Sequence, residues 1–270
     1  MKIFYGDNDD RDFSNTQKYA YLNWWFDDGY GKNQCSYQHI FDNFNMGKAF
    51  IGNALLTLCN ILELNNSMSV ADKLIFPILF DLWHGLELWL KSCVSALDLR
   101  NTGNSCSKRG HDISRLMGEM ETLLKNNDYG DNLLKAIVPV RNIIAEFKRV
   151  GANFDFARYS FRNNKDFQFY NAPYKSDKQW QTTRDDINQN IVPNTCVDIN
   201  NLFELLADIF QVFGCFVEYL TYCILEGDEI SDKSYCEYLT MLKKYEGAFK
   251  QYDLQDAKRP AQIIINEIMK

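Results

Sequence analysis

The stretch FDLWHGLELWLK, residues 80–91, combines a strongly apolar pattern with polar side chains at helical spacing. Its leucines and tryptophans cover most of the circumference of a helix, which predicts a helix at the centre of the fold. His84, Glu87 and Lys91 are three and four residues apart, so they share the remaining stripe of that helix.

Two interpretations of this polar stripe are open. The three side chains could satisfy one another in the core, where an unpaired polar group is costly. Alternatively, His84 and Glu87 could be metal ligands or an acid–base pair. H-x-x-E supplies only two ligands, and the other histidines of the chain are His39 and His111. We therefore favour the structural interpretation and predict no metal and no cofactor.

The composition of the chain predicts an all-α protein. Five prolines and 14 glycines in 270 residues are few, and 46% of the residues are hydrophobic, which favours long helices around a large core. Apolar spacing predicts helices at about 37–64, 69–99, 111–125, 129–150, 198–226 and 231–252. We expect a break near Gly47, a bend or a helix start at Pro77, and a fourth helix that accommodates Pro139.

The expected organisation is a single mainly helical domain over 1–270. Residues 1–36 form an irregular segment, and 37–150 and 196–255 form the helical core. Between the two parts of the core, 151–195 loses helical period and alternates aromatic with polar residues. We expect an elaborated loop or a small hairpin there, and loops of this length are often functional.

Charge and hydropathy exclude some functions and locations. A net charge of −7 and a pI near 5.1 argue against duplex DNA as a partner, because that binding depends on neutralising phosphates. The most apolar segment, 202–225, carries polar groups at helical spacing and reads as a core helix rather than a membrane span. The start has no apolar run of signal-peptide length, and eight cysteines include no C-x-x-C pair. We predict a cytoplasmic protein without a membrane partner.

A longer pattern extends from the opening stretch. F-P-x-x-F-x-x-x-H-x-x-E-L-x-L-K is formed by Phe76, Pro77, Phe80, His84, Glu87, Leu88, Leu90 and Lys91. H-D-hydrophobic-x-x-L follows as His111, Asp112, Ile113 and Leu116. The two motifs resemble those of HEPN-like proteins, which are all-helical bacterial domains. A third family feature, an Asp before a loop with F-R-Y-P, is echoed by Asp155, Phe161 and Arg162, with Asn163 and Asn164 in place of Tyr-Pro.

The resemblance covers about residues 74–166. It implies an up-and-down helical bundle, often a homodimer, in a bacterial defence or toxin–antitoxin type system. It also implies that the polar residues of the two motifs meet between adjacent helices. The implied structural network consists of His84, Glu87, Lys91, His111 and Asp112.

Many HEPN domains cut RNA with an Arg-x(4–6)-His motif, and the closest match here is RNIIAEF, residues 141–147. Glu146 stands where the His would fall. Three interpretations are open: Arg141 and Glu146 point outward from a core-packing helix, the site is degenerate but still binds RNA or a nucleotide, or Glu146 acts as the base. The last makes Arg141 and Glu146 candidate catalytic residues, although a carboxylate is a poor proton shuttle at neutral pH unless its environment is unusual.

A local charge excess follows this motif. Residues 141–165 carry six Lys or Arg against two Asp or Glu, which is a net +4 in an acidic chain, and aromatic residues are interleaved with the cations. Surfaces that bind single-stranded nucleic acid combine phosphate contacts with base stacking in this way. The candidate ligand-binding residues are Arg158, Tyr159, Arg162 and Lys165. The alternative is that these cations pair with helix carboxylates while the aromatics cap the core.

The leading hypothesis is a non-catalytic, HEPN-like binding protein whose ligand is RNA or a nucleotide. One alternative is a metal-independent RNase with an altered Arg-x4-Glu site. The other is a structural or protein-interaction domain. The sequence identifies neither the ligand nor the pathway.

Overall fold

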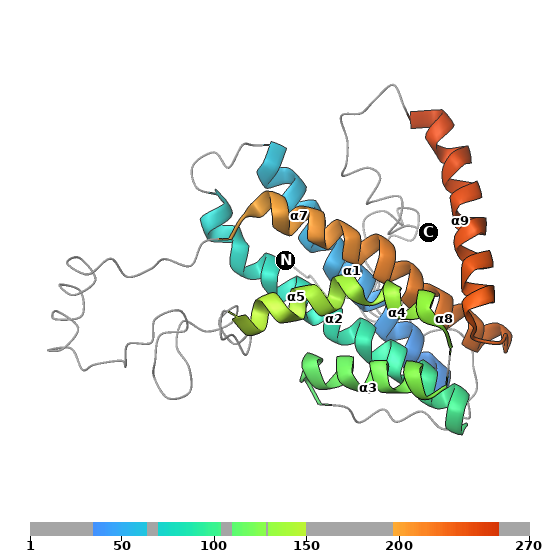
Figure 1. Cartoon of the computed structure of the whole chain (residues 1–270). Coiled ribbons are helices and arrows are strands. Elements are labelled where there is room, and N and C mark those ends of the chain that lie inside the picture. The colour runs from blue at the N-terminus through green and yellow to red at the C-terminus, as the bar shows by residue number, and fades with distance from the viewer. Residues whose placement is uncertain (1–34, 64–69, 104–109, 128, 150–196, 254–270) are drawn as a thin grey trace, which may run out of the picture. The chain divides into compact units, whose positions relative to one another are not determined.

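The computed structural model describes residues 35–63, 70–103, 110–127, 129–149 and 197–253. In this part of the chain the backbone forms helices and their connecting turns, with no strand, as the all-α prediction expects (Figure 1). None of these helices is both long enough and apolar enough to cross a membrane. The irregular segment predicted at the N-terminus and the loop or hairpin predicted at 151–195 fall outside the described residues, apart from the first residues of the first helix.

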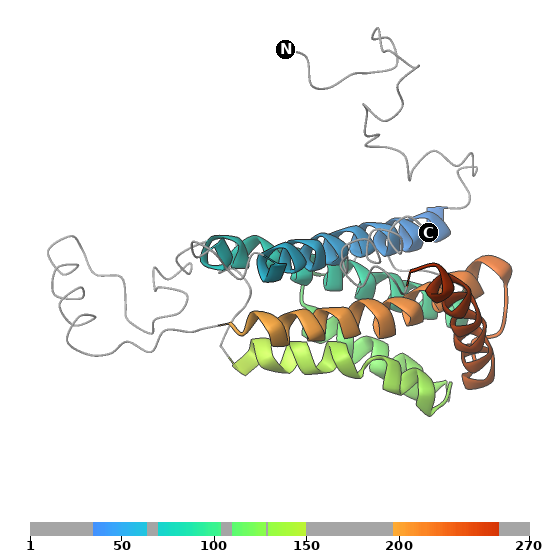
Figure 2. The same ribbon diagram turned by 90° about the horizontal axis from the view of Figure 1, so that it is seen from above.

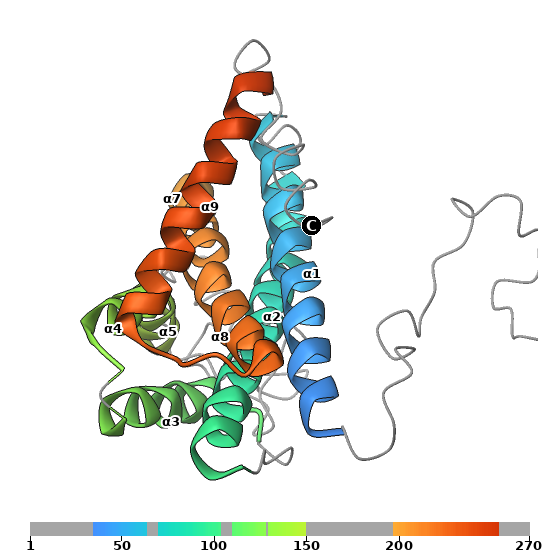
Figure 3. The ribbon, with the colours of Figure 1, turned by 90° about the vertical axis from the view of Figure 1, so that its right-hand side faces the viewer.

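The helices pack around α2, which contacts α1, α3 and α8. Two views show α1 and α2 side by side along most of their length, with α7 and α8 following one another alongside them (Figures 2 and 3). The described helices belong to one compact unit that begins at Cys35. Their bounds are α1 Cys35–Glu63, α2 Val70–Thr102, α3 Ile113–Asn126, α4 Asp131–Ala136, α5 Val138–Arg149, α7 Ile199–Asp208, the π-helical turn η5 Ile209–Phe213, α8 Gly214–Glu226 and α9 Asp232–Asp253.

Two glycines allow α1 and α2 to approach closely. A Cβ atom on Gly85 would lie 2.5 Å from Ile51 Cγ1 and 3.0 Å from the Gly47 carbonyl oxygen, and one on Gly47 would overlap the Trp89 indole. Trp89 is buried, and its Nε1 donates a hydrogen bond of 2.9 Å to the Phe44 carbonyl. The break expected near Gly47 is therefore wrong: α1 is continuous, and the glycine makes room for a side chain of the neighbouring helix.

The prolines act differently from each other. Pro77 lies inside α2, which begins at Val70, so it does not mark the start of that helix. The single helix expected around Pro139 is wrong, because the chain divides there into α4 and α5. The Ile137 N–H bonds to the Lys135 carbonyl and closes α4, while Pro139 has no N–H to continue the ladder.

The single helix expected over 198–226 is interrupted by the π-helical turn η5. Trp89 is packed against this turn, with the ring centroids of Phe210 and Phe213 at 6.1 and 5.8 Å from its own. A Cβ atom on Gly214, directly after the turn, would lie 3.0 Å from the indole. The wider turn and the glycine together leave the space that the buried tryptophan fills.

Asp232, the first residue of α9, caps the start of α4. Its carboxylate accepts hydrogen bonds from the backbone N–H groups of Asn132 and Leu133, at 3.0 and 3.2 Å on Oδ1, and from Asn132 Nδ2 at 3.1 Å. Gly130 precedes α4 with φ 107°, and a Cβ atom there would overlap the Asp232 carboxylate. These contacts join α4 to a residue about a hundred positions later in the chain.

Candidate functional site

Glu87 is a buried carboxylate that contacts a lysine and a histidine. Its side chain is 6% exposed, and its Oε1 lies 2.5 Å from Lys91 Nζ and 2.8 Å from His111 Nδ1. Lys91 is one turn further along α2, whereas His111 stands just before α3 and leaves 85% of its side chain in solvent. Lys91 and His111 satisfy a carboxylate that would be costly to bury alone, and the His111 contact ties the start of α3 to α2.

The other two members of the expected network lie nearby but make different contacts. Asp112 is the N-cap of α3, where its Oδ1 accepts hydrogen bonds from the Ser114 and Arg115 N–H groups at 2.9 and 3.1 Å. His84 lies among rings instead. Its imidazole is 4.6 Å from the Phe50 centroid in an edge arrangement and stacks 5.8 Å from Phe80. The structure thus brings Glu87, Lys91 and His111 together.

Arg141 is exposed on α5 and forms an ion pair with a residue of α3. Its Nε lies 3.0 Å from Glu121 Oε1, and Lys125 Nζ lies 3.9 Å from the other oxygen of the same carboxylate. The Arg141 guanidinium therefore has a partner that competes with any phosphate. This pair also connects α5 to α3.

Glu146 is exposed on the same helix as Arg141 but does not share its face. Five residues correspond to a rotation of about 140° around a helix, so the two side chains leave α5 in different directions. Ile143 and Ile144, which lie between them in the sequence, and Phe147, which follows Glu146, are buried. This is the arrangement expected if RNIIAEF serves the core and its charged residues point outward.

The candidate ligand-binding residues Arg158, Tyr159, Arg162 and Lys165 lie outside the described residues, as do the positions that echo the third family motif. Their assignment to RNA or a nucleotide stays a prediction.

A second carboxylate on α2, Asp81, was missed in the sequence. Its Oδ2 accepts a hydrogen bond of 2.6 Å from Asn53 Nδ2 of α1. Burial raises the pKa of Asp81, and the Asn53 bond and the nearby His84 lower it by less. Asp81 lies within the quoted stretch, three residues before His84, but only the packing of α1 on α2 reveals its partner.

Three thiols of the described helices are not activated as nucleophiles. Cys93 is fully buried, and that burial strongly raises its pKa. The pKa values of Cys59 and Cys223 are also raised, chiefly by burial. Since the thiolate is the reactive form, these three cysteines stay protonated and unreactive near neutral pH.

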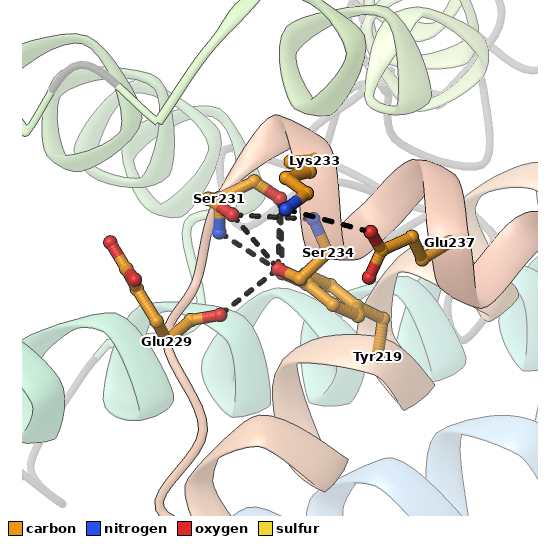
Figure 4. Close-up of polar contacts among 6 residues, drawn as sticks. All are labelled: Tyr219, Glu229, Ser231, Lys233, Ser234 and Glu237. Atoms are coloured by element: carbon orange, nitrogen blue, oxygen red, sulfur yellow. Dashed lines mark hydrogen bonds and ion pairs between the residues drawn. The ribbon is translucent and has the colours of Figure 1, made fainter.

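Tyr219 forms a hydrogen-bonded cluster where α8 meets α9 (Figure 4). Its hydroxyl lies 2.6 Å from Ser234 Oγ, accepts from the Ser231 N–H at 3.1 Å, and lies 3.1 Å from the Ser231 carbonyl. Ser234 Oγ also donates to the Glu229 carbonyl at 3.0 Å. Burial raises the pKa of Tyr219 to about 12, which keeps the hydroxyl protonated. The cluster fixes the turn between the helices.

Among the described residues, no group of three or more His, Cys, Asp or Glu side chains is placed to hold a metal ion. No family model, curated protein or solved structure matches the chain.

Proposed function

We propose that the chain is a HEPN-like, non-catalytic binding protein of a bacterial defence or toxin–antitoxin type system, with RNA or a nucleotide as its ligand. The proposal rests on the two motifs at Phe76–Lys91 and His111–Leu116 and on the helical architecture of the described residues. The observation that carries the non-catalytic part is the position of the RNase-like pair. Arg141 is engaged by Glu121, and Glu146 leaves α5 in another direction.

The polar residues of the first motif support the same interpretation. Lys91 and His111 both contact one oxygen of the buried Glu87 carboxylate, so both side chains have a partner within the fold. A buried carboxylate that is satisfied in this way stabilises a helix pair and has no unpaired group directed at a substrate. The ligand would then be bound elsewhere, and the cationic and aromatic residues at 158–165 are the candidates.

The test is an RNA retention and cleavage assay with the purified full chain. A labelled pool of single-stranded RNA should be retained without being cut, and retention should weaken as salt rises. Replacing Arg158 and Arg162 together by Ala should reduce retention by about tenfold, because each contact with a phosphate contributes to affinity. The matched control replaces Arg115 and Lys125 of α3, both exposed, and should leave retention unchanged.

Two results would contradict the proposal. RNA cleavage that disappears in a folded Arg141→Ala variant would establish the RNase alternative. Absence of retention for RNA and for free nucleotides would leave the interaction-domain alternative.

A further inference from the structure

We draw no further inference here: the strongest candidate, the exposed apolar side chains of Val212, Tyr222 and Met241 on η5, α8 and α9, carries nothing because nothing in the described part of the chain shows that they form one surface or what covers them.

Discussion

Two carboxylates of α2, Glu87 and Asp81, differ in their burial and in their hydrogen-bond partners. Glu87 is the more deeply buried, and its single contacting oxygen has both Lys91 and His111 within hydrogen-bond distance. Asp81 is only half-buried, yet in the described residues it has a neutral amide as its hydrogen-bond donor, and burial raises its pKa. The difference shows that the partners of an acidic group matter as well as its depth: the more deeply buried Glu87 has a lysine and a histidine on its oxygen, whereas Asp81 has a neutral amide.

The largest expected effect comes from the residue that lies between these carboxylates on α2. Gly85→Ala adds a Cβ atom 3.0 Å from the Gly47 backbone oxygen, which cannot give way as a flexible side chain would. We expect a loss of about 3 kcal/mol in the free energy of unfolding, from overpacking between α1 and α2. Urea denaturation measures this. Gly118→Ala, at a helix position where the added atom meets nothing, is the matched control and should not destabilise the chain. Equal stability of the two variants would mean that α1 and α2 can move apart far enough to accommodate the added atom at no cost in stability.

The next largest effect is expected at Glu87, and it can be compared with the effect of removing its partner His111. Glu87→Ala should destabilise the chain by about 1–3 kcal/mol, because the largely buried Lys91 ammonium loses its partner. His111→Ala removes a largely exposed side chain and should cost less than about 1 kcal/mol. The measurement is the urea midpoint of both variants at neutral pH. An unchanged midpoint for Glu87→Ala would show that the network contributes nothing to stability.

The smallest effect has the opposite sign. Because the folded-state pKa of Asp81 is raised, its ionised form disfavours the folded state; this loss of stability begins as pH rises past the pKa of the unfolded chain and is complete above the raised pKa of the folded chain. Asp81→Asn keeps a group that can accept the Asn53 hydrogen bond, so it should raise stability at neutral pH. The gain should be under about 0.5 kcal/mol, since water screens a half-exposed group.

The pH dependence of that gain supplies the check. Below the ordinary carboxyl pKa of about 4, Asp81 is protonated in both the folded and the unfolded chain, so the gain should disappear. Thermal unfolding of the wild type and Asp81→Asn at several pH values measures it. A gain that persists at low pH would assign the effect to packing rather than to charge.

The sequence predicted those helix positions that depend on the spacing of apolar residues close together in the chain. Apolar spacing located α1, α2, α3 and α9 to within a few residues, because a buried face repeats with the helix period. It did not predict the division at Ile137 or the turn η5, since these depend on how the backbone accommodates Pro139 and Trp89.

In the candidate site, too, the sequence predicts contacts between residues close together in the chain and does not predict contacts between distant ones. Glu87 and Lys91 are one turn apart, so the sequence alone places them together. The Asn53–Asp81 pair joins residues 28 positions apart, and nothing in either local pattern indicates it. Arg141 likewise stands out in RNIIAEF, but its partner Glu121 comes from another helix.

The Asp232 cap on α4 has a consequence for synthesis on the ribosome. The chain emerges from its N-terminus, so α4 is exposed about a hundred residues before the carboxylate that caps it. A helix of six residues is too short to persist without such support. We therefore expect α4 to be completed during translation only when Asp232 at the start of α9 becomes available to cap it.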